Sequence, residues 1–271
     1  MVRSLWTAAS GMIAQQTSVD TISNNLANIN SVGYKKETVE FKSLLYQTLQ
    51  GKSTDSDGNA KPVGIQVGLG VRTAAITSQY TQGALNRTEN TFDFAISGKG
   101  FFAVQLEDGS IGYTRDGSFQ MCLGQDGLVL SDSEGHPVLD AGYQPITVPA
   151  NIKSSAITVD ARGRLMYPDG NNNAQSMGVQ IGLFQFPNPS GLEKGAGSIL
   201  KQTEASGEAV PEGGEDTASL SILSQGYIEA SNVQAVDEMV NMIVAQRAYE
   251  MNSKAITASD DMLRMANNLK Q

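Results

Sequence analysis

Near the start of this sequence runs a stripe of residues spaced in alternating steps of three and four, and no other feature constrains the fold as strongly. Such steps keep successive side chains on one side of an α-helix and are typical of helices that pack on other helices. Between Ser4 and Gly33 the only charged residue is Asp20, so the remaining faces carry Thr, Ser, Gln and Asn. Because a solvated helix usually carries charges, we expect neighbouring subunits to cover this one. The stripe consists of Leu5, Ala8, Met12, Gln15, Val19, Ile22, Leu26 and Ile29.

An internal helix of a single globular domain is the alternative interpretation of this segment. Gly11 costs about 1 kcal/mol relative to Ala inside a helix, and the close approach of a second helix would offset that cost. Poor helix formers accumulate over residues 24–30, and Gly33 is placed to end the helix.

A second helix is predicted at the other end of the chain. It begins after Ser231 and Asn232, either of which is suited to cap its first turn, and it continues almost to Gln271. Its apolar positions follow mixed steps of three and four and skip Gln246 and Ser253. We therefore expect the two terminal helices to pack on each other. The apolar positions are Val236, Val240, Ile243, Tyr249, Ile256, Leu263 and Ala266.

Between the predicted helices, the sequence is typical of a compact antiparallel β domain. Residues 92–96 and 102–106 alternate apolar and other side chains around Gly98-Lys99-Gly100, which predicts two strands joined by a tight turn. Further glycine turns are expected at 107–110, 125–127, 133–135 and 169–170. Short strands separated by turns this frequently favour an antiparallel sheet over a parallel one.

The predicted fold class is α+β, with three parts. Residues 1–34 and 226–271 form a terminal-helix domain in which the two helices make a coiled coil. Residues 35–75 form an extended linker or hairpin region with a flexible loop, and residues 76–225 form the β-rich domain. Polar, glycine-rich stretches at 51–64 and 204–217 are predicted loops.

The charge balance and the rarest residue types exclude several classes of function. The 19 Lys and Arg residues against 28 Asp and Glu residues give a net charge of −9, without a basic cluster suited to nucleic acid. Cys122 is the only cysteine and His136 the only histidine, which excludes an internal disulfide and metal sites built from several such residues. We expect Cys122 in the apolar core and His136 in a solvated turn. We expect neither a cofactor, nor a metal, nor insertion into a membrane.

An enzyme is the alternative of another class. Asp108, Asp116, Asp126 and Asp169 are each followed by glycine, which is typical of turns. Two of them acting as acid and base would suit a carbohydrate-active enzyme of the cell envelope. Gly-x-Gly sequences at 68–70, 98–100 and 195–197 lack the remaining spacing of a phosphate-binding loop. A monomeric binding module with helical stalks is a second alternative.

Three groups of segments carry motifs that belong together. At one end they are residues 4–12, 15–16, 22–30 and 33–36, and in the middle they are 98–102 and 113–119. At the other end they are 226–233, 238–243 and 246–256. The motif residues are Asn24, Asn25, Asn28, Gly33, Gly100, Phe101, Arg115, Asp116, Gly117, Gln246 and Arg247. In this order, the segments resemble the rod and hook family of axial proteins in the bacterial flagellar basal body.

The resemblance implies a structural subunit without enzymatic activity. Such proteins assemble into a hollow helical shaft that crosses the periplasm, transmits motor torque to the hook and encloses an export channel. The length and the segments 46–49 and 64–68 are most similar to the subgroup that builds the distal rod. A proximal rod protein or another axial protein of the hook and basal body is the alternative. The residues expected to pack between subunits are Leu5, Met12, Val19, Ile22, Leu26, Ile29, Val236, Val240, Ile243, Tyr249, Ile256 and Leu263.

The resemblance also implies partners and a location. Further copies of this chain form the helical rod, and they adjoin proximal rod proteins and the hook protein or its junction. Other implied partners are the P-ring and L-ring proteins where an outer membrane is present, the rod cap and the type III export apparatus. Export through that apparatus implies that no signal peptide is cleaved. Residues 44–71 match the region by which the distal rod stiffens its subunit contacts, and we expect them to become ordered on assembly.

Overall fold

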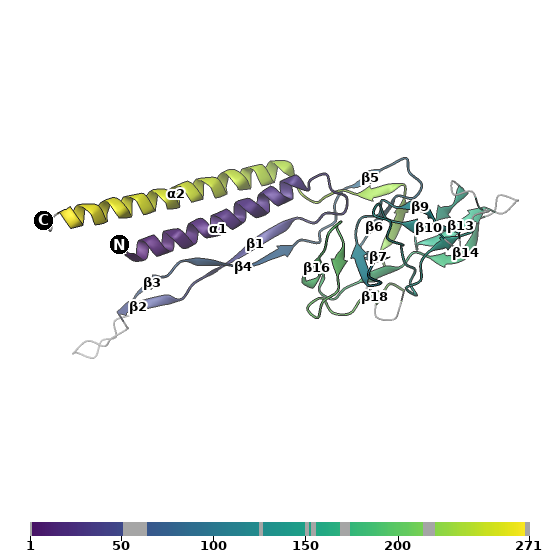
Figure 1. Ribbon diagram of the computed structural model, residues 1–271, viewed down its shortest axis with the longest axis horizontal. Coiled ribbons are helices and arrows are strands. Elements are labelled where there is room, and N and C mark those ends of the chain that lie inside the picture. Colours follow the sequence, from purple (N-terminus) through teal and green to yellow (C-terminus); the bar gives the residue numbers. More distant parts are fainter. Residues whose placement is uncertain are drawn as a thin grey trace. The chain divides into compact units, whose positions relative to one another are not determined.

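The computed structural model describes residues 2–50, 64–124, 127–149, 152, 156–168, 174–213 and 220–268 (Figure 1). The fold is α+β, with one long helix at each end of the chain and antiparallel strands between them. Every strand pairing among the described residues is antiparallel, as the sequence predicts. The chain divides into two compact units. Unit 1 comprises Met1–Ala27, Glu37–Ser78 and Gln234–Gln271, and unit 2 comprises Asn28–Lys36 and Gln79–Val233.

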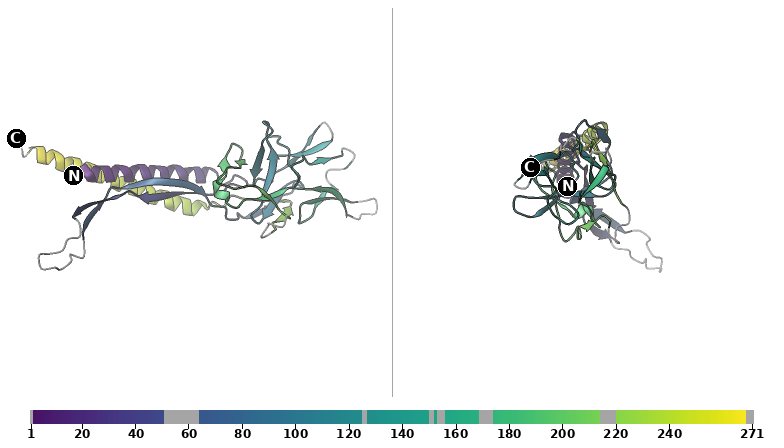
Figure 2. Two further views of the ribbon diagram at one scale, coloured as in Figure 1. Left: turned by 90° about the horizontal axis from the view of Figure 1, so that it is seen from below. Right: turned by 90° about the vertical axis from the view of Figure 1, so that its right-hand side faces the viewer.

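Unit 1 consists of two helices and two short β-ribbons (Figures 1 and 2). Helix α1 contacts α2 along one side and the β1–β4 ribbon along another. The second ribbon is formed by β2 and β3. The bounds are α1 (Val2–Ala27), β1 (Glu37–Ser43), β2 (Tyr46–Gln50), β3 (Ile65–Gly68), β4 (Val71–Ser78) and α2 (Ala235–Asn268).

The two helices run antiparallel, and small or polar side chains lie where they meet. The hydroxyls of Ser4 and Ser259 are 3.2 Å apart, and the Asn25 amide nitrogen donates to a Glu238 carboxylate oxygen at 3.2 Å. A Cβ atom on Gly11 would lie only 2.9 Å from the side-chain nitrogen of Asn252. The predicted close approach of a second helix at Gly11 is therefore confirmed.

The face through which the helices meet differs from the predicted apolar stripes. On α1 the buried residues are Ala8, Ala14, Thr21 and Asn25, whereas the large residues of the stripe are half-buried. On α2 the buried residues are Glu238, Ala245 and Ser259. Small side chains let the backbones approach closely, and this arrangement leaves larger apolar residues at the sides of the contact. Of the predicted α2 positions, Val236, Val240, Ile243 and Tyr249 are exposed, and Ile256 and Leu263 are half-buried.

The predicted helix ends require correction. Helix α1 ends at Ala27, so Ile29 lies beyond it and Gly33 does not end it. Helix α2 begins at Ala235, so neither Ser231 nor Asn232 is its N-cap. The Asn232 side chain is used elsewhere in unit 2, where its oxygen accepts a hydrogen bond from the Lys36 amide at 2.7 Å.

Unit 2 is built from short strands arranged in several small sheets. Its largest sheet has the order β16-β17-β8-β7-β15-β18, and two three-stranded sheets have the orders β11-β10-β9 and β12-β13-β14. Two further two-stranded sheets of unit 2 are formed by β19 with β6 and by β20 with β5. The bounds are β5 (Leu85–Arg87), β6 (Phe94–Ser97), β7 (Phe101–Gln105), β8 (Ile111–Thr114), β9 (Gln120–Leu123), β10 (Leu128–Ser131), β11 (Thr147–Val148), β12 (Thr158–Val159), β13 (Arg164–Pro168), β14 (Ala174–Gln180), β15 (Leu183–Gln185), a 3-10 helix (Pro189–Gly191), β16 (Glu193–Lys194), β17 (Leu200–Lys201), β18 (Val210–Pro211), β19 (Ile222–Gln225) and β20 (Tyr227–Glu229).

The strands on either side of Gly98-Lys99-Gly100 do not form the predicted hairpin. Strand β6 pairs with β19, whereas β7 pairs with β8 and β15. Strand β7 is buried on both faces, with Phe102 and Val104 in one apolar cluster and Phe101 and Ala103 in the other. The alternating sequence of β7 predicts a strand with one buried face, but both of its faces are buried.

Three smaller expectations also meet the structure. Cys122 is exposed on the edge strand β9, so its predicted place in the core is wrong. His136 lies in the predicted turn, but its ring is largely covered and lies 2.9 Å from an Asp132 carboxylate oxygen. The predicted loop at 204–217 contains the short strand β18, and its residues 214–217 lie outside the described part of the chain. Of the predicted loop at 51–64, only Gly64 belongs to the described part of the chain. The predicted turn residues Asp126 and Asp169 lie outside that part.

Candidate assembly surface

Apolar side chains are distributed very unevenly between the two units. Among the described residues, 27 hydrophobic residues are buried, and the only three in unit 1 are Ala8, Ala14 and Ala245. Of 23 large hydrophobic residues that are exposed, 18 belong to unit 1. Burying one Val, Leu, Ile, Phe or Met side chain contributes roughly 1.5–3 kcal/mol to stability. The exposed apolar side chains of unit 1 do not make this contribution in the single chain. A surface of this kind marks a site of contact with other proteins.

Helix α2 carries the longest exposed apolar face. Val236 is 73% exposed, Val244 62% and Met251 65%, although all lie within a regular helix. The same helix exposes Met239, Val240, Ile243, Tyr249, Met262 and Met265. Methionine adapts its shape to irregular neighbours, which suits a face packed against more than one partner.

Helix α1 and the ribbons extend this surface. On α1, Trp6 is 72% exposed and Ile13 is 66% exposed. Leu45, between the two ribbons, is 83% exposed. The ribbons further expose Phe41, Tyr46, Leu49, Ile65, Leu69 and Ile76 in or beside their strands. We name the exposed apolar residues of α1, α2 and the two ribbons the assembly surface.

The structure gives most of the motif residues a role within the chain itself. Asn25 holds the start of β1, because its side chain accepts from the Glu37 amide and donates to the Glu37 carbonyl, both at 2.8 Å. Asn24 donates to the Glu37 carboxylate at 3.4 Å, and Asn28 accepts from the Ser31 hydroxyl at 3.1 Å. These contacts fix the turn that follows α1.

Two motif residues of α2, by contrast, point to solvent in the single chain. Gln246 and Arg247 are both exposed. Arg247 lies 3.3 Å from a Glu250 carboxylate oxygen, and both side chains are more than half exposed. Exposed ion pairs contribute little to stability. The motif at this position is thus not explained by contacts within the chain.

A buried ionic cluster in unit 2 joins the motif residue Arg115 to Lys35 and Glu229, which come from distant parts of the sequence. The fully buried Glu229 carboxylate lies 2.5 Å from Lys35 Nζ and 3.0 Å from an Arg115 guanidinium nitrogen. Burial lowers the pKa of Lys35, against the opposing influence of the Glu229 charge. Arg115 also lies over the ring of the motif residue Phe101, 5.2 Å from its centre.

Neither Glu229 nor Lys35 is among the functional residues predicted from the sequence. The available signal was that Glu229 is the only charged residue between Asp216 and Asp237. Nothing in the spacing of these residues indicates that Lys35 and Glu229 meet across 194 positions.

Gly33 is required beside this cluster. Its φ of 68° lies in the left-handed region, and a Cβ atom would come within 2.7 Å of the Arg115 carbonyl carbon. Its amide donates to the Glu229 carbonyl at 2.8 Å. The backbones of the other two motif glycines also form hydrogen bonds. The Gly100 amide donates to the Ser221 hydroxyl, and the Gly117 carbonyl accepts from the Phe94 amide.

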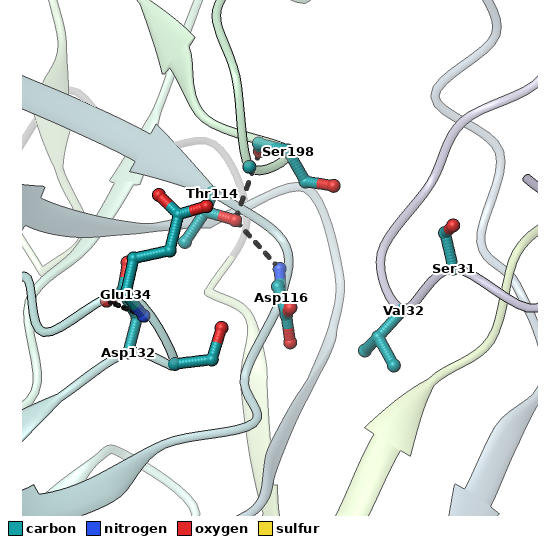
Figure 3. A pocket seen from close by; sticks show the side chains of 9 residues that line it. Ser31, Val32, Thr114, Asp116, Asp132, Glu134 and Ser198 are labelled. Atoms are coloured by element: carbon teal, nitrogen blue, oxygen red, sulfur yellow. Dashed lines mark hydrogen bonds between the residues drawn. The ribbon is translucent and has the colours of Figure 1, made fainter.

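The pocket in Figure 3 contains Asp116, one of the four carboxylates named for the enzyme alternative, beside two carboxylates that were not among them. Its volume is about 250 Å³, and Asp116, Asp132 and Glu134 lie among its lining residues. Asp116 accepts hydrogen bonds from the Ser118 amide at 2.9 Å and the Ser118 hydroxyl at 2.6 Å. Asp132 accepts from the amides of Glu134 and His136 at 2.9 and 2.8 Å. Both carboxylates therefore hold turns, as the following glycine predicts for Asp116.

The pKa values of two predicted turn carboxylates move in opposite directions. Burial raises the pKa of Asp116, and the charges of Asp132 and Asp93 add to that increase. Hydrogen bonds from Ser110 lower the pKa of Asp108, which is exposed. Among the residues that the structure describes, no group of three or more His, Cys, Asp or Glu side chains is placed to hold a metal ion. None of the helices in the described part is both long and apolar enough to cross a membrane.

Three family models match this chain in sequence order. Residues 5–35 match the flagella basal body rod protein, and residues 95–167 match the D1 domain of the flagellar hook protein FlgE/F/G. Residues 224–269 match the C-terminal part of the flagellar basal body rod FlgEFG protein.

Individual relatives match over their whole length. The flagellar basal-body rod protein FlgG of Borreliella burgdorferi is 43% identical over 273 residues, covering 100% of both chains. FlgG of Bacillus subtilis is 37% identical, again over 100% of both chains. The flagellar hook-basal body complex protein FlhP of the same organism is 29% identical over the full length of both.

Proposed function

Because this chain belongs to the flagellar basal-body rod protein family and is a structural subunit of the rod, we propose that it forms the distal rod as a self-assembling, hollow helical drive shaft. In this proposal the shaft transmits torque from motor to hook and encloses the export channel. The identities to relatives named FlgG support the distal position. In Bacillus subtilis, FlgG is the more similar of the two relatives compared above, which disfavours the alternative of another hook–basal body protein.

One observation carries the assembly proposal, namely that the described residues of unit 1 expose 18 large hydrophobic side chains, whereas the hydrophobic residues that they bury are alanines only. Copies of the chain would cover the assembly surface of one another. Different patches on α1, α2 and the ribbons favour heterologous contacts, and such contacts produce a helical filament when they do not close into a ring. Coiled-coil packing of α1 with α2, and packing between subunits through the predicted stripe positions, belong to this proposal.

In this proposal the protein is not an enzyme. Its other proposed partners are the proteins that adjoin a distal rod. They are proximal rod proteins, the hook protein or its junction, the P-ring and L-ring proteins where an outer membrane is present, the rod cap and the type III export apparatus. Its place in the basal body would span the periplasm. The carboxylates of the pocket in Figure 3 support a non-enzymatic role, since Asp116 and Asp132 already accept several hydrogen bonds within turns.

The test is electron microscopy of basal bodies isolated from the protein's own host after deletion of its gene. We expect a shaft that stops short of its full length and carries no hook. Loss of the entire shaft would assign the chain to the proximal rod. Intact basal bodies would overturn the proposal and bring the enzyme and the binding module forward. Expression of the unaltered gene in the deletion strain is the matched control.

A further inference from the structure

The ionic cluster of unit 2 lies on the segments by which the chain connects the two units. The chain passes between the units after Ala27, after Lys36, after Ser78 and after Val233. Residues of unit 2 next to these passages, namely Lys35, Lys36, residues 79–83 and residues 229–232, bond to one another.

Glu229 lies on one of these connecting segments and forms hydrogen bonds to two others. Its carboxylate accepts from Lys35 Nζ, from the Gly83 amide at 2.9 Å and from Arg115. Lys35 Nζ also donates to the Thr81 carbonyl at 2.8 Å. Arg115 in turn donates to the Gly98 carbonyl at 2.6 Å. The carboxylate thus ties the segments after α1, after β4 and before α2 to a residue in the interior of unit 2.

Asn232 duplicates this connection with a neutral side chain. Its oxygen accepts from the Lys36 amide, and its nitrogen donates to the Gln79 carbonyl at 2.8 Å and the Thr81 hydroxyl at 2.8 Å. The Gln79 amide itself donates to the Lys36 carbonyl at 2.8 Å. Glu229 and Asn232 therefore reach the same connecting segments by separate sets of bonds.

Aromatic packing continues the connection into unit 2. Tyr80 makes an edge contact with Phe101 at 5.6 Å between ring centres, and Phe101 contacts Phe186 at 5.7 Å. Phe186 contacts Tyr113 at 4.8 Å. Since Arg115 lies over Phe101, the ionic cluster and this aromatic row share a common support.

A buried ionic cluster is weak evidence for stability in itself, because its charges lose their hydration. Its geometry, however, is demanding, since each charge must keep its partners in order to remain buried. A side chain such as Glu229, with three partners on separate segments, specifies one arrangement of those segments better than an apolar side chain would.

We propose that Glu229 and Asn232 are positioning residues that clamp the connecting segments of the chain to the interior of unit 2. The clamp joins the segments side by side, so that force entering through any one of them is shared by the others and by Arg115. The mechanical consequence rests on the proposed function as a shaft subunit, whereas the clamp itself is a property of the single chain.

The test measures amide hydrogen exchange in the full-length, monomeric Glu229→Gln variant. We expect the amides of Gly33, Gly83 and Ala230 to exchange at least about tenfold faster than in the parent, as local opening requires. The amides of Val138 and Ile146, in the core of unit 2, are expected to keep their rates. Glu193→Gln, an exposed Glu to Gln change in unit 2, is the matched control and should alter neither set.

The Asn232→Ala variant keeps the test decisive if Glu229→Gln does not fold, because it leaves no buried charge unpaired. It should accelerate exchange at the amides of Lys36 and Gln79 without changing the core. Unchanged exchange in the connecting segments would overturn the clamp, and so would equal acceleration throughout unit 2, which indicates a role in overall stability alone. Neither result depends on the shaft, so a complete shaft in the gene-deletion strain would contradict the proposed function separately.

Discussion

At the scale of single residues, the family motif is largely a set of backbone-fixing contacts. Asn25 satisfies both polar groups of the Glu37 backbone, and Gly33 allows the chain to pass against Arg115. These residues serve the folding of one chain, whereas Gln246 and Arg247 are exposed on it. The motif residues by which this sequence resembles the family are thus of both kinds, and only the structure separates them.

Gly33→Ala should destabilise unit 2 by roughly 1–3 kcal/mol, since φ at this position is 68° and the new methyl group would meet the Arg115 backbone. Urea unfolding of the full chain, followed by circular dichroism in the strand region, measures the change. Gly109→Ala is a useful control, because its φ of 78° imposes similar backbone strain while nothing lies within 4 Å of its added Cβ. Equal losses for both variants would show that contact with Arg115 is unimportant.

Asp116→Asn should make unit 2 more stable at pH 7. A carboxyl whose pKa is raised by folding binds its proton more tightly in the folded chain, so its ionisation lowers stability at pH values above both pKa values. That penalty disappears as the pH falls through the pKa of the folded state towards the ordinary aspartate pKa of 3.8. The advantage of the variant should therefore vanish in acid. Urea midpoints at pH 7 and near pH 3.5 test this, and a variant equally or less stable at pH 7 would contradict the argument.

At the scale of elements, α1 and α2 show how far sequence periodicity leads. The two long helices, their mutual packing, the close approach at Gly11 and the antiparallel strands could all be predicted. The face of contact could not, because small or polar residues such as Ser4, Gly11 and Ser259 lie where the helices meet, and most of the apolar stripe is left at the sides of that contact. Periodicity finds the most apolar face of a helix without indicating which partner covers it.

The central strand β7 shows a second limit. Its residues are buried on both faces, and its neighbours β8 and β15 come from different parts of the chain. Alternation of side chains suggested a hairpin with β6 instead. The cluster of Lys35, Arg115 and Glu229 could not be predicted at all, because long-range pairing of charges leaves no local pattern.

Ile243→Asp should abolish assembly of the rod without unfolding the monomer, since Ile243 is 56% exposed in the single chain. Leu123→Asp is the matched control, because Leu123 is 85% exposed but belongs to unit 2. Electron microscopy of rods, with thermal unfolding of each monomer, measures both effects. Normal rods from Ile243→Asp would refute the role of the assembly surface on α2.

Amide exchange should be fast along α1 in dilute monomer and slow in the core of unit 2. Among the residues of α1 whose burial the structure describes, the only buried hydrophobic ones are Ala8 and Ala14, and a helix with so little buried apolar surface is marginal in water. Exchange measured by mass spectrometry on the full chain resolves the two regions. Strong protection over residues 5–27 at low concentration would contradict this expectation.

At the scale of the whole molecule, the two units differ in their cores. Among the described residues, both hydrophobic core clusters belong to unit 2. Unit 2 holds 24 of the 27 buried hydrophobic residues among those described, whereas unit 1 holds most of the exposed ones. The net charge of −9 adds a mutual repulsion between free subunits that apolar contacts must overcome.

Self-association should therefore strengthen with salt. Added sulfate screens the repulsion and favours burial of apolar surface, so sedimentation at a fixed protein concentration should shift to larger species. A double substitution of exposed apolar residues, Val244→Ser with Met251→Ser, should weaken that response. Dissociation on adding salt would mean that ionic contacts dominate between subunits.

The scarcity of fully buried apolar side chains among the described residues of unit 1 also determines where the proposed polymer of this chain would grow. Two free subunits that collide cover only a fraction of each other's exposed faces, and they still lose the conformational entropy of ordering two helices. A subunit that arrives at the end of an existing filament meets several finished neighbours and gains all of their contacts for the same loss. Nucleation is then slow while elongation is fast, so an existing end keeps its advantage over filaments that would otherwise start elsewhere.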